Sequence, residues 1–156
     1  MRASCHHYTF DDLKIRKLVI SKIEGKLLNL FAGKNRLCIS EVRVDNDPDL
    51  QDIDYRMDVG EFLSRNHLKF DTIIYDPPWN ERKSKEFYNG RYIGRFTKLK
   101  DNIVNTLNHN GKIISIGYEI DNFGSKRGML LEEVVVINPS GEIRPFFITI
   151  ERKIRS

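Results

Sequence analysis

Four consecutive residues, Asp76-Pro77-Pro78-Trp79, have the types needed for a rigid polar binding loop. Two adjacent prolines fix two φ angles and remove two backbone donors, so nearby carbonyl groups remain free to accept hydrogen bonds. Asp76 adds a carboxylate acceptor, and Trp79 adds a flat apolar surface. Stiff acceptors beside an aromatic ring suit a planar substrate that bears an NH₂ group. The structural alternative is a rigid turn followed by a tryptophan in the core.

Methyl transfer to such an NH₂ group is the reaction that this loop favours. The exocyclic nitrogen of adenine is a poor nucleophile because its lone pair is delocalised into the ring. Two acceptors that hold both N–H bonds favour a pyramidal nitrogen whose lone pair points at a methyl donor. Asp76 would also stabilise the positive charge that develops on the nitrogen. The base must be flipped out or single-stranded to reach the loop, and stacking on Trp79 is worth about 1–3 kcal/mol.

Basic and aromatic residues interleave directly after this loop, in residues 80–92. The residues that we expect to hold phosphates or stack on bases are Arg82, Lys83, Lys85, Tyr88 and Arg91. The net charge of +4 and the pI of about 9.1 are compatible with a polyanionic partner. A solvated helix face with core aromatics is the alternative for this segment.

Alternating strand and helix patterns place the loop at the end of a buried strand. Strand-like runs lie at residues 26–31, 41–45, 70–75, 112–118, 130–137 and 143–151, and helical stripes lie at residues 10–23, 59–66 and 99–107. Asp11 or Asp12 can cap the first helix, and residues 108–111 are expected to end the last one. This order predicts an α/β fold with a mainly parallel sheet. The last two strands must be antiparallel, because only a short turn at residues 138–141 joins them. The 156 residues fit a single domain, in which residues 1–25 form a segment and a helix that pack on the sheet.

Taken together, these motifs resemble the Rossmann-like S-adenosylmethionine-dependent methyltransferases over residues 26–151. The run from Asp76 to Trp79 is similar to the (Asp/Asn)-Pro-Pro-(Tyr/Phe/Trp) motif of the amino-group methyltransferases, above all small archaeal and phage-like adenine-specific DNA methyltransferases. The resemblance implies S-adenosylmethionine as cofactor, the N6 amino group of adenine as methyl acceptor, and DNA in preference to RNA. It also implies a seven-stranded sheet with helices on both faces and a C-terminal antiparallel hairpin.

The same resemblance assigns the cofactor contacts. They are Asn29, Phe31, Ala32, Gly33, Asp45, Asn46, Asp58 and Val59. The run from Asn29 to Gly33 resembles the first motif, Asp45 matches the acidic position that binds the ribose hydroxyls, and Asp58-Val59 resembles the motif at the adenine ring. Capping of the next segment is the alternative role for both aspartates.

The first motif departs from the family pattern in its charge and its glycines. Asn29 stands where an acidic residue is usual, and only Gly33 remains where two or three glycines are usual. Gly33 still permits close approach of the backbone to a ligand. About ten residues, 31–40, link the first two strands, so we expect a very short crossover helix.

The composition argues against a membrane-spanning, secreted, disulfide-rich or metal-binding protein. No apolar run approaches the roughly 20 residues that cross a bilayer. The N-terminus has no apolar secretory region, so we expect a cytoplasmic protein. Cys5 and Cys38 are too few for a disulfide framework, and we expect no metal site.

Three functions remain open at this point. The first is a nucleic-acid amino methyltransferase that acts on DNA or RNA adenine. The second is a protein glutamine methyltransferase, which usually has Asn in place of Asp76. The third is a non-catalytic binding module with the same fold. We expect no separate target-recognition domain in a chain of this length. Target choice would then come from its own loops or from a partner, either a homodimer copy or a specificity subunit, or the enzyme would not select a target sequence.

Overall fold

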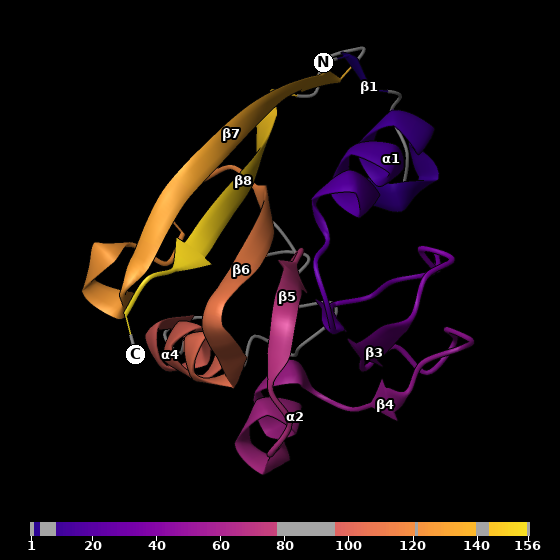
Figure 1. Ribbon diagram of the computed structural model, residues 1–156. Helices are drawn as coiled ribbons and strands as arrows, with labels where there is room; N and C mark the ends of the chain where they lie inside the picture. The colour runs from indigo at the N-terminus through magenta and orange to yellow at the C-terminus, as the bar shows by residue number, and fades with distance from the viewer. Residues whose placement is uncertain (1, 4–8, 78–95, 121, 140–143, 156) are drawn as a thin grey trace.

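Eight strands form one sheet in the part of the chain that the computed structural model describes, which is residues 2–3, 9–77, 96–120, 122–139 and 144–155 (Figure 1). The strands are β1 (Arg2–Ala3), β2 (Leu27–Leu30), β3 (Glu41–Asp45), β4 (Tyr55–Arg56), β5 (Phe70–Tyr75), β6 (Leu107–Gly117), β7 (Met129–Pro139) and β8 (Phe146–Lys153). The helices are α1 (Leu13–Lys22), α2 (Val59–Arg65) and α4 (Phe96–Thr106), with 3₁₀ turns η1 (Thr9–Asp11) and η2 (Ser125–Arg127).

The order of the strands changes direction beside β2. The sheet runs β1-β7-β8-β6-β5-β2-β3-β4. From β2 the chain passes outward through β3 and β4 and then returns to β5 on the other side of β2, with parallel pairing throughout. β6 is parallel to β5, and β8 lies antiparallel between β6 and β7. Strands β2 to β8 confirm the predicted seven-stranded, mainly parallel sheet with its antiparallel C-terminal pair, and the two-residue β1 extends the β7 edge.

The strand bounds agree with the sequence patterns to within two residues, except that β6 begins earlier and β8 begins later than predicted. The two-residue strands β1 and β4 were not predicted. β3 and β5 have the predicted ends. β6 begins at Leu107 rather than at Lys112, because Leu107 pairs with Phe70 ahead of a register irregularity. Residues 108–111, which we expected to end a helix, are therefore part of a strand. The turn predicted at residues 138–141 extends outside the described residues.

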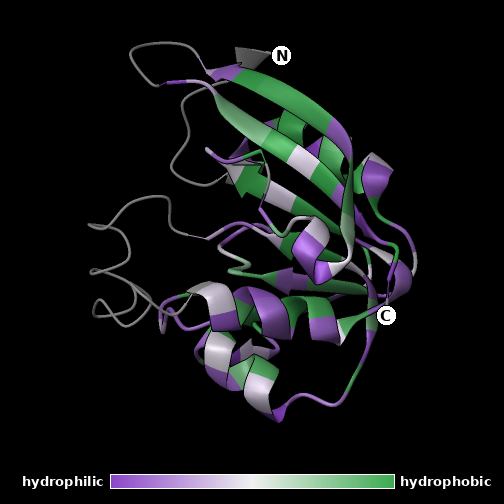
Figure 2. Ribbon diagram, turned by 90° about the vertical axis from the view of Figure 1, so that its left-hand side faces the viewer, coloured by the Kyte–Doolittle hydropathy of each residue, from purple (hydrophilic) through white to green (hydrophobic). Residues whose placement is uncertain are grey.

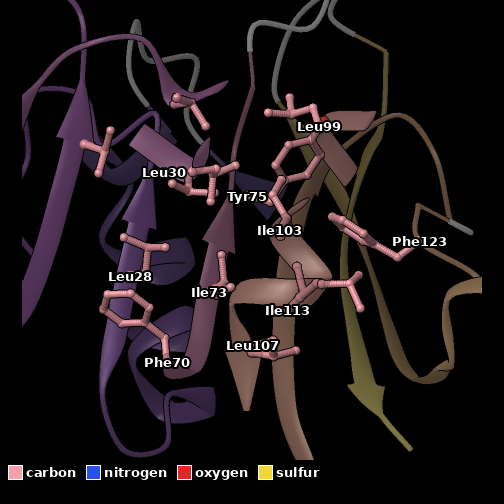
Figure 3. Close-up of a cluster of buried hydrophobic side chains, with 14 of the residues drawn as sticks. Leu28, Leu30, Phe70, Ile73, Tyr75, Leu99, Ile103, Leu107, Ile113 and Phe123 are labelled. Atoms are coloured by element: carbon pink, nitrogen blue, oxygen red, sulfur yellow. The ribbon is translucent and has the colours of Figure 1, made fainter. Parts of the chain in front are cut away.

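Alternating side chains give the sheet two apolar faces. Leu28, Leu30 and Ile73 point to the face covered by α2 and α4, where they join Phe62 and Ile103 (Figure 3). Their strand neighbours point the other way and pack under α1; this second cluster includes Leu27, Ile74, Ile114, Ile15 and Val19. Such two-faced burial is typical of parallel strands with helices on both sides. In Figure 1, α1 accordingly lies on one side of the sheet, and α2 and α4 lie on the other.

Two of the helices, α1 and α2, begin at side-chain caps. Asp12, one of two aspartates predicted to cap the first helix, accepts hydrogen bonds from the N–H groups of Lys14 (2.8 Å) and Ile15 (3.1 Å). Figure 2 shows hydrophobic residues concentrated along the strands, while both kinds alternate along the helices. Among the described residues, no helix has the length and apolar character needed to span a membrane.

The crossover from β2 to β3 differs from its prediction. Residues 31–40, all of which the structure describes, contain no helix, so the expected very short helix was wrong. A crossover this short has too few residues to reach the next parallel strand and also complete helical turns. Its backbone hydrogen bonds must therefore be made by other parts of the molecule.

Tyr75, at the end of β5, gives the fold a testable dependence on alkaline pH. Burial raises the pKa of its phenol well above the ordinary value, with Glu119 adding to the shift. The native state keeps the phenol neutral, whereas the unfolded chain releases the proton near pH 10, so the free energy of unfolding falls as pH rises above about 10. We expect Tyr75→Phe to weaken this fall, measured by urea unfolding between about pH 9 and pH 11. Tyr55→Phe, at an exposed ring, is the control; an identical pH slope in Tyr75→Phe and wild type would contradict the assignment.

Candidate active site

The carboxyl ends of β3, β2 and β5 bring three predicted site residues to one level of the sheet. The register places Val44, Leu30 and Tyr75 side by side, so Asp45, Phe31 and Asp76 follow on neighbouring strands. Asp45 and Asp76 are thus two strand spacings apart, or about 10 Å. The strand order reverses at this edge, and open α/β sheets bind ligands beyond the carboxyl ends of the strands at such a point.

Asp45 and Gly33 are in direct contact. The Gly33 N–H donates to Asp45 Oδ2 (3.0 Å), and the Asp47 N–H donates to Oδ1 (3.0 Å). Asp45 therefore braces the turn after β2 and begins its own turn, and no helix follows it for it to cap. Each carboxylate oxygen has a second acceptor position, so Asp45 retains capacity for a ligand hydroxyl. Asn46 follows at the same edge and is half-buried.

Phe31 has an unusual backbone for an aromatic residue. Its φ is 57°, and Gly33, two residues on, has a φ of 65°. The left-handed region suits glycine but costs other residues about 1–2 kcal/mol. The Phe31 ring packs edge-on against Tyr75, with 6.0 Å between centroids, and Tyr75 packs edge-on against Phe123 at 5.4 Å. This aromatic row links the strained turn to the apolar core on the α2 and α4 face of the sheet.

Asn29 lies deeper than the other predicted cofactor contacts. Its side chain is fully buried, and its Nδ2 donates to Glu41 Oε2 at 2.9 Å. The other amide atom, Oδ1, has no hydrogen-bond partner among the residues that the structure describes. A buried acceptor of this kind could receive a bond from a ligand that enters between β2 and the crossover. Ala32 is buried at the same turn, and its N–H donates to Val44 O at 3.1 Å.

Asp58 and Val59 have clear structural roles. Asp58 is the N-cap of α2, where its Oδ1 accepts from the Glu61 N–H at 3.0 Å. Val59 is 1% exposed and belongs to the core beneath α2. The capping alternative for Asp58 is therefore realised, and contact of either residue with an adenine ring stays a prediction.

The catalytic loop is described only at its start. Asp76 and Pro77 are half-buried and follow β5 directly. Pro78 and Trp79 lie outside the described residues, as do Arg82, Lys83, Lys85, Tyr88 and Arg91. Their proposed roles in stacking and phosphate binding remain predictions.

Two buried charged residues beside the candidate site were missed by the sequence reasoning. Glu41 and Arg43 point to one face of β3 with fully buried side chains, and 3.7 Å separates Glu41 Oε1 from Arg43 Nε. Burial lowers the pKa of the Arg43 guanidinium, while the Glu41 carboxylate opposes that shift. The alternation of charged and apolar residues in β3 suggests an ordinary half-exposed strand. The short crossover was the signal that could have revealed them, because a connection without a helix needs side chains to accept and donate its backbone hydrogen bonds.

Among the described residues, no three His, Cys, Asp or Glu side chains gather as a metal site requires. The groups that can hold a ligand are the Asp45 carboxylate, the backbone of the Gly33 turn, the Phe31 ring and the Asn29 acceptor. This set offers hydrogen-bond acceptors for hydroxyl and amino groups and an apolar surface for a flat ring.

No protein-family model matches the chain, and no curated protein matches it either. Several solved structures are similar to it. SMU.776, described as a methyltransferase complexed with S-adenosylhomocysteine, aligns with a TM-score of 0.64 and 19% identity over 88% of this chain and 48% of that chain. TrmN from Thermus thermophilus aligns with a TM-score of 0.63 and 16% identity over 92% and 49% of the two chains.

A third similar structure is matched over most of its length. The N-methyltransferase NodS from Bradyrhizobium japonicum, in complex with S-adenosylhomocysteine, has a TM-score of 0.59 and 13% identity over 92% of this chain and 85% of that chain. The chain spans about half the length of SMU.776 and TrmN. At these identities the likeness concerns the fold alone, and it shows that the chain has the Rossmann-like methyltransferase fold.

Proposed function

We propose that this chain is an S-adenosylmethionine-dependent methyltransferase that methylates the N6 amino group of adenine in nucleic acid. The observation that carries the proposal is the position of Asp76-Pro77, directly after β5 and beside the reversal of strand order. Two of the similar structures contain S-adenosylhomocysteine, and NodS is an N-methyltransferase, which supports this reaction class.

The cofactor would be held by the edge of β2 and β3. Asp45 accepts from hydroxyl groups of the ribose, and the Gly33 turn lets the backbone approach the ligand closely. Phe31 offers an apolar ring, and Asn29 Oδ1 offers an acceptor for the amino group of the methionine arm. When bound, S-adenosylmethionine supplies an electrophilic methyl group on a sulfonium centre.

Asp76 would act on the methyl acceptor. Its carboxylate accepts one N–H bond of the adenine amino group, and a backbone carbonyl of the proline run accepts the other. Holding both N–H groups directs the nitrogen lone pair away from the ring and offsets the positive charge that develops there. Trp79 would stack on the base.

A nucleic-acid substrate is favoured by a cation–π contact between Arg144 and Tyr118. The exposed Arg144 stacks on Tyr118, with 3.6 Å between the guanidinium carbon and the ring centroid. Gly117 of β6 pairs with Phe147 of β8, so this pair lies just beyond the carboxyl end of β6, next to β5. A cation on an aromatic surface at this edge is suited to phosphates and bases. The preference for DNA over RNA rests on the resemblance of the Asp76–Trp79 motif.

Removal of the Asp76 carboxylate is the central test. Wild-type protein is incubated with tritiated S-adenosylmethionine and duplex DNA, single-stranded DNA, RNA or a glutamine-containing protein, and the product is identified by mass spectrometry. We expect N6-methyladenine from one nucleic-acid pool, and none from Asp76→Ala, whose affinity for S-adenosylhomocysteine stays within a few-fold of wild type.

The exposed Glu132→Ala on β7 is the control for loss of a carboxylate and should retain activity. Label in methylglutamine would redirect the proposal to a protein substrate. Normal activity in Asp76→Ala would refute the mechanism. Cofactor binding without transfer to any pool would favour the non-catalytic module.

Asp45 provides a separate test of cofactor binding. Asp45→Asn removes the charge and turns one acceptor into a donor that faces a backbone N–H, so we expect the Kd for S-adenosylhomocysteine to rise about ten-fold or more. Isothermal titration measures this Kd, with Asp47→Asn in the same turn as the matched control. An unchanged Kd in Asp45→Asn would leave Asp45 with a purely structural role.

A further inference from the structure

Two buried charges next to the helix-free crossover, Glu41 and Arg43, hydrogen-bond to both ends of the first motif. Arg43 Nη2 donates to Gly33 O (2.7 Å) and Ala32 O (3.3 Å), and its Nη1 donates to Asp52 O (3.3 Å). The Arg43 side chain therefore ties the turn after β2 to the loop before β4. A buried guanidinium is stable only when such acceptors and an opposite charge surround it.

Glu41 is the opposite charge, and it fastens the other end of the crossover. Its Oε1 accepts from the Leu37 N–H (3.0 Å), and its Oε2 accepts from Asn29 Nδ2 (2.9 Å). A crossover helix would satisfy backbone groups internally. Here the Glu41 and Arg43 side chains of β3 hydrogen-bond to backbone groups of the crossover instead.

The Gly33 backbone is held from both sides as a result. Asp45 receives its N–H, and Arg43 donates to its carbonyl oxygen. Glycine loses more conformational entropy on ordering than any other residue. A Gly33 turn without these two hydrogen bonds would therefore lose entropy when a ligand binds to it. Fixing it in advance lowers that cost.

We propose that Arg43, paired with Glu41, is a positioning residue that presets the Ala32–Gly33 turn for the cofactor. The pair replaces the crossover helix and the missing glycines of the first motif. This inference rests on the proposed function, because it assigns the turn to S-adenosylmethionine.

Arginine is required by this geometry. Its planar fork reaches the two carbonyls after β2 and the carbonyl of Asp52 together, whereas a lysine ammonium keeps the charge on one point. Arg43→Lys therefore preserves the ion pair with Glu41 but loses some of these bonds. The double variant Glu41→Gln/Arg43→Met removes both charges together and leaves no unpaired ion, which keeps a folded protein available for the test.

The experiment measures affinity and local order in the same proteins. Titration with S-adenosylhomocysteine gives the Kd, and amide hydrogen exchange reports on residues 31–37 and 50–54. Arg152→Lys is the matched control, because Arg152 also contacts two carboxylates and a backbone carbonyl. Arg152 is the strand neighbour of Lys112 in β6 and lies toward the end of the sheet away from the candidate site.

We expect Arg43→Lys and the double variant to bind S-adenosylhomocysteine about ten-fold or more weakly, with faster exchange confined to those two segments. Arg152→Lys should retain the wild-type Kd. A wild-type Kd in folded Arg43→Lys, or faster exchange spread evenly over the sheet, would overturn the inference. Failure of wild type and Arg152→Lys to bind the ligand would instead overturn the proposed function, and this inference with it.

Discussion

A buried ion pair beneath an irregular crossover is the interaction on which the rest of this structure depends. β2 and β3 are parallel, and the connection between them contains no helix. Glu41 and Arg43 hydrogen-bond to that connection from within the sheet, and they sit where an amphipathic helix would bring apolar side chains. Loss of one partner of such a pair costs about 3–5 kcal/mol, because the remaining charge stays buried. Each charge therefore depends on the other for its burial, and the hydrogen bonds of the pair hold the turn at the candidate site.

The parallel sheet brings the candidate site residues together at the carboxyl ends of its strands. Three adjacent strands end at the same level, which brings together residues that are separated by up to 45 positions in the chain: Phe31, Asp45 and Asp76. Asp45 and Asp76 follow strands on either side of β2. Under the proposed function, the sulfonium charge of the cofactor would be attracted by both carboxylates.

Local patterns predicted most of the fold. β3 and β5 were predicted to the residue, because apolar runs with strand propensity end there at polar loops. Asp12 was among the predicted caps, since an aspartate ahead of a helical stripe has few other roles. The start of β6 was missed because its first residue pairs with Phe70, a contact between segments far apart in the chain. The crossover helix was missed because chain length alone does not show how backbone groups will be satisfied.

The sequence by itself determined the order of the six longer strands and the position of the Asp76 loop after a strand, because both follow from local periodicity and turn chemistry. Only the tertiary structure decided that Asn29 is buried against Glu41, that Gly33 is held between Asp45 and Arg43, and that Asp58 caps α2. These outcomes depend on which strands lie side by side and on the cost of burying charge. Both are properties of the assembled sheet and not of any segment alone.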